Sequence, residues 1–143
     1  MTYKILLPVD GSDASLHAAQ HIAALKANMQ ALEVFIINVQ PEADNWMVRR
    51  SIKPGELEKM EQEWSNDAMV PERDILQAAD VTCQMRMVHG EVAPAVVRLA
   101  TELCCQQIVM GVSSHGSALG DLLLGSVVSE LLHLSSIPVT FIK

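Results

Sequence analysis

Hydrophobic and polar positions along the chain follow two alternating patterns. Short, nearly continuous apolar runs such as "KILLPV" and "VFIINV" are typical of strands buried on both faces. Between them, apolar residues recur at helical spacing, as in "SLHAAQHIAAL", which predicts helices with one apolar face. The predicted strands cover residues 3–10, 32–40, 81–90, 106–112 and 137–143, and the predicted helices cover 12–30, 55–79, 91–105 and 121–135.

Three segments modify this pattern. Pro71 lies inside the predicted helix 55–79, so we expect a break or kink near Val70. Pro94 falls in the first turn of the predicted helix 91–105, where its missing N–H costs little. Residues 42–54 fit neither pattern, and we expect a mobile loop there.

The order of elements predicts a parallel sheet. Strands that alternate with helices and are apolar throughout favour a doubly wound α/β fold with right-handed crossovers, formed by one domain over residues 1–143. In such a sheet, ligands bind beyond the carboxyl ends of the strands, where the winding direction reverses. With the first strand at the centre, this point lies between the first and fourth strands, at "PVDGS" and "MGVSSHG".

Charge and composition narrow the choice of partners. The formal net charge is -7, so neither nucleic acid nor an anionic membrane surface is an expected partner. The three cysteines, Cys83, Cys104 and Cys105, form no disulfide framework or zinc pattern. Together with the lack of a basic leader before the first strand, they predict a cytoplasmic protein.

The glycine-rich stretch "MGVSSHGSALGDLLLGS" is the first candidate site. Gly111 and Gly116 permit a tight backbone path, and Gly125-Ser126 lies near the start of the last helix, where N–H groups favour an anion such as phosphate. His115, within the loop, could contact the same anion. The sequence matches neither the Walker loop nor the dinucleotide fingerprint. Glycine and serine also end strands and cap helices without a ligand, so both interpretations remain open.

Asp10 is the second candidate. At the end of the first strand its carboxylate could bind a ribose hydroxyl or a Mg²⁺ ion beside phosphates. Equally, an Asp before Gly11 can simply form the turn into the next helix.

Several segments resemble the universal stress protein family. They are "KILLPVDGSDASLHAAQHIAAL", "INVQP", "HGEVAPAVVRLA" and "IVMGVSSHGSALGDLLLGSVVSELLHLSSIPVTFIK", which leave out the stretch around residues 42–80. The resemblance implies a flavodoxin-like, five-stranded parallel sheet with strand order 3-2-1-4-5, related to the adenine nucleotide alpha-hydrolase fold. It also implies a homodimer formed through the last strand, "PVTFIK", whose unpaired edge such pairing would cover.

Members of that family that bind ATP resemble the pattern Gly-x2-Gly-x9-Gly-Ser/Thr, and this chain departs from it. Four residues separate Gly111 from Gly116, and eight separate Gly116 from Gly125, so the loop is one residue longer and its middle glycine is displaced. "GDLLLGS" and "PVDGS" are retained, which favours ATP binding with Mg²⁺. The residues that the resemblance implies for the nucleotide are Pro8, Val9, Asp10, Val39, Met110, Gly111, His115, Gly116, Gly125, Ser126 and Val127, with Asp10 the possible Mg²⁺ ligand.

Three functions remain open at this point. The first is a homodimeric stress-response protein that binds ATP, hydrolyses it slowly at most, and signals through its occupancy. The second is a dimeric stress protein that binds no nucleotide and acts as a protein-interaction module. The third is an adenylating ligase, for which a chain of 143 residues leaves little room.

Overall fold

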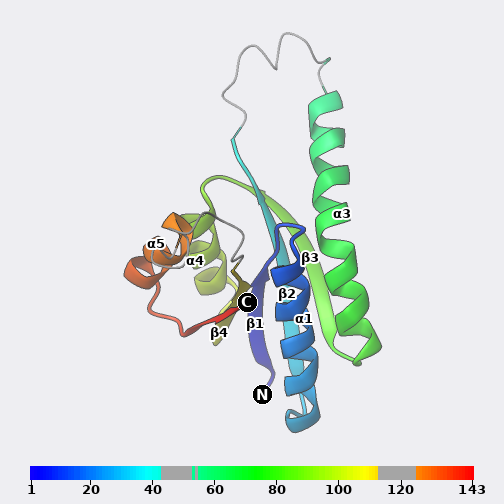
Figure 1. The fold of residues 1–143 in the computed structure, drawn as a ribbon, viewed down its shortest axis with the longest axis vertical. Coiled ribbons are helices and arrows are strands. Elements are labelled where there is room, and N and C mark those ends of the chain that lie inside the picture. The colour runs from blue at the N-terminus through cyan, green and yellow to red at the C-terminus, as the bar shows by residue number, and fades with distance from the viewer. Residues whose placement is uncertain (43–52, 54, 113–124) are drawn as a thin grey trace.

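The computed structural model describes residues 1–42, 53, 55–112 and 125–143. Figure 1 shows the strands side by side in one sheet, with helices on both of its faces. In chain order the elements are β1 (Tyr3–Pro8), α1 (Asp13–Leu25), the short 3-10 turn η1 (Lys26–Asn28), β2 (Leu32–Gln40), α3 (Glu56–Ala78), β3 (Thr82–His89), α4 (Val92–Glu102), β4 (Gln107–Gly111), α5 (Ser126–Leu134) and β5 (Val139–Ile142).

The sheet has the predicted topology. Its five strands lie in the order β3-β2-β1-β4-β5, and every neighbouring pair is parallel. On the central strand, Ile5 is paired with Val34 of β2 on one side and with Gln107 of β4 on the other. The winding direction therefore reverses between β1 and β4, which confirms the predicted α/β class, strand order and switch point.

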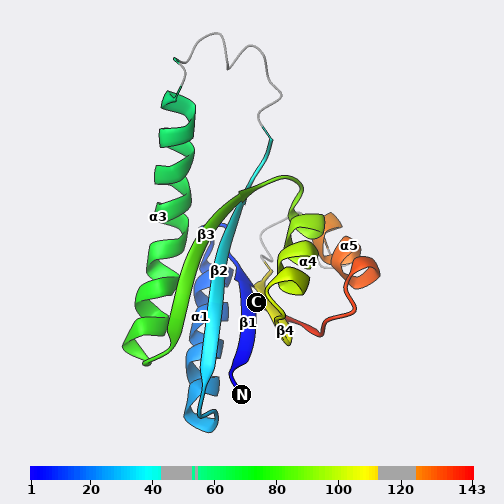
Figure 2. The ribbon, with the colours of Figure 1, turned by 180° about the vertical axis from the view of Figure 1, so that it is seen from behind.

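Two hydrophobic layers hold the sheet between its helices. Ile5 and Leu7 of β1 pack toward α1 and α3, whereas Leu6, between them, packs toward α4 and α5. The alternation follows from the strand period of two residues. Figures 1 and 2 show α1 and α3 together on one face of the sheet and α4 and α5 on the other.

Helix α3 differs from the prediction. It runs unbroken from Glu56 to Ala78 with Pro71 inside it, so the break expected near Val70 was wrong. Pro71 lies on the exposed side of the helix, as does Asp67, whose carbonyl loses its hydrogen-bond donor. Water can satisfy a carbonyl on that side, which is why the helix continues through the proline.

The remaining boundaries agree with the prediction within a few residues. Pro94 lies in the first turn of α4 as expected. Helix α5 is described from Ser126, and the predicted helical residues 121–124 lie outside the described residues, as does nearly all of the predicted loop 42–54. In the part of the chain that the structure describes, no helix is both long enough and apolar enough to cross a membrane.

Candidate nucleotide site

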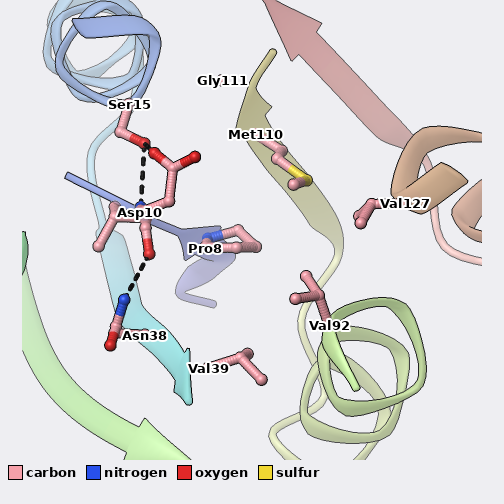
Figure 3. Close-up of a pocket in the computed structure, with 10 residues that line it drawn as sticks. Pro8, Asp10, Ser15, Asn38, Val39, Val92, Met110, Gly111 and Val127 are labelled. Carbon is pink, nitrogen blue, oxygen red and sulfur yellow. Dashed lines mark hydrogen bonds between the residues drawn. The ribbon is translucent and has the colours of Figure 1, made fainter. Parts of the chain in front are cut away.

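A pocket opens at the carboxyl ends of β1 and β4, where the winding direction reverses. Its volume is about 140 Å³. Figure 3 shows that the lining residues come from the ends of strands and from the helices next to them. The lining residues are Pro8, Val9, Asp10, Ser15, Asn38, Val39, Val92, Met110, Gly111 and Val127.

One wall of the pocket is polar and is built around Asp10. Its Oδ1 atom accepts a hydrogen bond of 2.9 Å from the Ser15 hydroxyl and one of 3.0 Å from the Ser12 backbone N–H. Ser12 is also the N-cap of α1, because its Oγ accepts from the Ser15 N–H at 3.3 Å. The start of α1 therefore fixes the orientation of the Asp10 carboxylate.

These hydrogen bonds decide the charge of Asp10. Partial burial alone would raise its pKa, but hydrogen bonds from Ser12 and Ser15 and from the backbone outweigh burial and lower the pKa of Asp10 below its ordinary value. The carboxylate is consequently ionised at neutral pH. The predicted turn-forming role of Asp10 is present in the same geometry, because its carboxylate accepts from the Ser12 N–H two residues further on.

Asn38 is a buried residue near the carboxyl end of β2. Its Nδ2 donates to the carbonyl of Val9 at 2.9 Å, and its Oδ1 accepts from Gln40 Nε2 at 2.7 Å. Because both polar atoms of this amide are engaged, Asn38 holds the end of β1 against the end of β2. Its contribution to the pocket is to shape it.

The opposite wall is apolar. Five side chains form it, and all of them except Pro8 pack against the hydrophobic layer under α4 and α5. Such a surface can pack against a flat, weakly polar group such as an aromatic base. The five residues are Pro8, Val39, Val92, Met110 and Val127.

Gly111 and Gly125 are glycines for different reasons. A Cβ atom on Gly111 would overlap the backbone C and O atoms of Ala14 and lie 2.6 Å from the Ser15 N. Gly111 therefore lets the end of β4 touch the start of α1. By contrast, a Cβ on Gly125 would meet no atom of the described residues within 4 Å, and Gly125 has an ordinary φ of -49°. In the part of the chain that the structure describes, neither packing nor backbone conformation requires a glycine at position 125.

The start of α5 lies beside the pocket. Gly125 is its N-cap and supplies no side-chain hydrogen bond, so the N–H groups of the first turn keep their hydrogen-bonding capacity. Val127 in that turn lines the pocket. An uncapped helix N-terminus carries partial positive charge and binds anions readily.

A family model described as the universal stress protein family matches residues 1–143, the whole chain. The chain belongs to the universal stress protein family. Universal stress protein MJ0531 of Methanocaldococcus jannaschii is 25% identical over 147 residues, covering 98% of this chain and 81% of that protein.

Solved structures of universal stress proteins and similar chains have the same fold. The structure of the protein MJ0577 superposes with a TM-score of 0.80 and 27% identity, covering 100% of this chain and 96% of that one. A universal stress protein solved in complex with cAMP has a TM-score of 0.65 and 24% identity, covering 99% and 96% of the two chains.

Most of the site residues predicted for this universal stress protein lie together. Seven of them line one pocket: Pro8, Val9, Asp10, Val39, Met110, Gly111 and Val127. Gly125 and Ser126 begin the helix that carries Val127. His115 and Gly116 lie outside the described residues.

The sequence analysis missed Ser15, Asn38 and Val92 as pocket residues. Two of them had a signal: Ser15 stands three residues after the N-cap Ser12, and Asn38 interrupts an apolar strand. Val92 had none, because a valine in the first turn of a helix is an ordinary core residue. As for a metal site, no group of three or more His, Cys, Asp or Glu side chains that could hold an ion is present among the described residues.

Proposed function

We propose that this universal stress protein binds ATP with Mg²⁺ in the pocket between β1 and β4, acts as a homodimer, and signals through its nucleotide occupancy. The base would pack on the apolar wall formed around Val39 and Val92. Asp10, on the opposite wall, would bind the ribose or the Mg²⁺ ion. The phosphates would lie at the start of α5, at Gly125, Ser126 and Val127.

The observation that carries the proposal is the empty space at Gly125. A glycine there is required neither by φ nor by packing against the described residues, and it stands directly before a helix N-terminus that no described side chain caps. Space for a group without protein atoms, next to unsatisfied N–H donors, suits phosphate. The related universal stress protein solved with cAMP gives an adenine nucleotide as a ligand of a protein with this fold.

The charge of Asp10 suits a role beside Mg²⁺. Its pKa is lowered by the hydrogen bonds described above, so it offers an ionised oxygen ligand, which this cation prefers. Mg²⁺ commonly binds through one or two carboxylates together with substrate phosphates, and a single protein carboxylate is sufficient for that arrangement.

Hydrolysis of ATP in this pocket would be slow at most. The lining residues that the structure describes include one carboxylate and neither Arg nor Lys. Fast phosphoryl transfer requires a cation that stabilises the transition state and a group that positions the attacking water. Signalling by occupancy therefore fits this site better than turnover.

The direct test is calorimetric titration of ligand-free protein with Mg·ATP, alongside ion-exchange chromatography of the small molecules released when fresh protein is denatured. We expect a Kd on the order of 1 μM, about -8 kcal/mol. Absence of released nucleotide together with absence of binding heat contradicts the proposal.

Gly125→Val sharpens this test. The new side chain enters open space at an ordinary φ, so the fold is retained while the space for phosphate is filled. We expect at least a 100-fold loss of ATP affinity, about 2.7 kcal/mol. Ser129→Val is the matched control, because it places the same side chain on an exposed position one turn further along α5. Equal affinity in the two variants would place the phosphates elsewhere.

The position of β5 supports the homodimer. β5 lies at one edge of the sheet. Pro138 and Ile142 accept hydrogen bonds from β4, so the N–H of Phe141, between them, points to the outer edge. We expect light scattering to give twice the mass of one chain at 50 μM, and Phe141→Pro to give monomers while circular dichroism shows a folded chain. A wild-type monomer at that concentration contradicts the dimer.

The altered glycine spacing favours a second candidate function, a dimeric interaction module without a nucleotide. The middle glycine of the family pattern is displaced in this chain. A stable dimer that releases no nucleotide and gives no heat with Mg·ATP would establish this second function in place of the first.

A further inference from the structure

The outward side of α3 is unlike an ordinary solvated helix face. At 100° per residue, five residues in the first three turns of α3, residues 56–67, fall within an arc of roughly 100°. This arc is opposite the buried residues Glu61, Ser65, Met69, Glu72 and Leu76. We name these five residues the outer stripe: Glu56, Met60, Glu63, Trp64 and Asp67.

The outer stripe exposes large apolar side chains where a soluble helix normally places polar ones. Trp64 is 52% exposed and Met60 is 38% exposed. The buried side of the same helix meanwhile contains two carboxyl groups, Glu61 and Glu72. Exposed apolar and buried polar residues are the informative exceptions to normal burial. Folding of this chain does not explain Trp64, since its side chain does not face the core.

Negative charge surrounds the two apolar residues. Glu56, Glu63 and Asp67 are exposed and lie within one helical turn of Met60 or Trp64. None of the three forms an ion pair with a residue that the structure describes. The outer stripe thus combines an aromatic and a thioether anchor with three carboxylates over about 16 Å of helix.

We propose that the outer stripe of α3 binds a basic protein segment that carries apolar side chains, such as the lysine-rich face of an amphipathic helix. Tryptophan is enriched among residues that dominate binding energy, and a lysine or arginine can stack on its ring. The carboxylates select a cationic partner and attract it over long range. Nucleic acid and anionic lipid are repelled by this negatively charged surface.

The stripe lies at the pocket end of the molecule. Because α3 precedes the parallel strand β3, its first turns stand near the carboxyl ends of the strands, as Figures 1 and 2 show. Ala68, on the inner side of α3, is 3.9 Å from where a Cβ of Gly11 would lie, one residue after Asp10. A partner on the outer stripe therefore sits on the helix that packs behind the Asp10 turn.

The test uses a labelled, 18-residue synthetic peptide whose leucines recur at helical spacing among lysines. Its binding to the full chain is followed by fluorescence anisotropy. We expect a Kd on the order of 10 μM, typical of a small transient interface, and several-fold weaker binding when salt rises from 50 to 200 mM. A glutamate-leucine peptide of the same pattern should not bind.

Variants locate the binding surface. Trp64→Ser and the double variant Glu63→Lys with Asp67→Lys should each weaken binding about tenfold or more, whereas Trp64→Phe should retain most of it. The control is Leu132→Ser with Glu130→Lys on α5, which removes an exposed leucine and reverses an exposed charge elsewhere. All positions are exposed, and circular dichroism should show folded variants.

Two outcomes would overturn the proposal. If the α5 control weakens binding as much as the α3 variants do, the peptide responds only to the overall negative charge of the protein. If Trp64→Ser changes the dimer mass by light scattering and leaves peptide binding intact, the stripe contacts a second copy of this chain.

Discussion

The two helix layers of this protein differ in polarity although they cover the same sheet. The layer under α4 and α5 is apolar in all of its buried residues that the structure describes. The layer under α1 and α3 also buries Ser15, Glu61, Ser65 and Glu72. A core of similar size could be built from apolar residues on both sides of the sheet. Core packing alone therefore does not explain the polar side chains that are buried on one side.

The pocket explains part of this difference. It lies across the edge of the sheet, so each layer supplies one of its walls. The apolar layer supplies the wall with Val92 and Val127, and the polar layer supplies Asp10 and Ser15. Two chemically different walls in one small pocket thus follow from two chemically different layers.

Glu72 is a buried carboxyl of the polar layer whose hydrogen bonds are incomplete among the described residues. It is 1% exposed, and its Oε2 atom has no hydrogen-bond partner among the described residues, as is true of Ser65 Oγ. Burial raises the pKa of the Glu72 carboxyl, and the negative charge of Asp10 raises it further, whereas a backbone hydrogen bond opposes the shift. The polar layer therefore contains one carboxyl with a lowered pKa and one with a raised pKa.

The largest expected effect comes from adding a side chain at Gly111, where the end of β4 contacts the start of α1. Gly111→Ala should destabilise the fold by about 3 kcal/mol, because its Cβ would overlap backbone atoms of Ala14, which cannot move as a side-chain end can. Urea unfolding measures the change. Gly125→Ala is the control and should cost less than about 1 kcal/mol. Similar losses in both would mean that β4 and α1 are not in such close contact.

Glu72→Leu should stabilise the protein by about 1–2 kcal/mol, since it replaces a buried, incompletely hydrogen-bonded carboxyl with an apolar side chain of similar volume. Chemical denaturation at pH 7 gives this value. Leu76→Glu, one turn further along the same buried face, is the converse variant and should unfold the protein or nearly so. A loss of stability in Glu72→Leu would show that this carboxyl has a polar partner in solution.

The pH dependence of stability separates the two carboxyl groups. Glu72 has a raised pKa in the folded state, so the folded protein holds this proton more tightly, and its contribution to stability falls as pH rises above the ordinary glutamate pKa of 4.5. Asp10 has a lowered pKa, so its contribution is present above 3.8 and is lost as pH falls below that value. Unfolding free energies between pH 3 and 8 should fall less steeply above pH 4.5 in Glu72→Gln than in the wild type. Parallel curves would contradict the assigned shift.

The smallest expected effect concerns the hydrogen bonds that orient Asp10. Ser15→Ala removes the 2.9 Å hydrogen bond to Asp10 Oδ1 and should cost about 1 kcal/mol of stability. It should also raise the pKa of Asp10, which the carboxyl ¹³C shift measures by NMR. Ser129→Ala, on an exposed position of α5, is the control. An unchanged titration in Ser15→Ala would assign the lowered pKa to Ser12 and to the backbone of Asp10 instead.

The sequence was sufficient for the fold and for about half of the chemistry of the site. Continuous apolar strands alternating with helices predicted the parallel sheet, and strand ends at the switch point predicted that Asp10 and Gly111 face one pocket. Pro71 was misread because its cost depends on which side of the helix it occupies, which sequence spacing alone did not reveal. Gly111 was assigned to ribose and phosphate contacts, whereas the structure also shows a packing requirement from Ala14.

The buried carboxyl groups were unpredictable for a related reason. Glu61 belongs to the acidic run 56–63, whose composition is typical of a solvated helix face, but Glu61 is 6% exposed and accepts a 2.7 Å hydrogen bond from His89. A charged side chain inside a polar helix gives no local signal that it faces inward. Only the packing of α3 on the sheet, a contact between distant parts of the chain, determines that.

The amide of Asn38 has a consequence for how a base could be selected. Its Nδ2 and Oδ1 atoms each make one hydrogen bond within the protein, which leaves one N–H and one lone pair, and the apolar wall contributes hydrocarbon and thioether groups. A purine held on that wall would therefore be read by the polar groups around it, which are the Asn38 amide, the side chains of Asp10 and Ser15, and main-chain groups at the strand ends. The valines of the wall offer no hydrogen bond, so their exchange for other aliphatic residues would leave this set of polar groups unchanged.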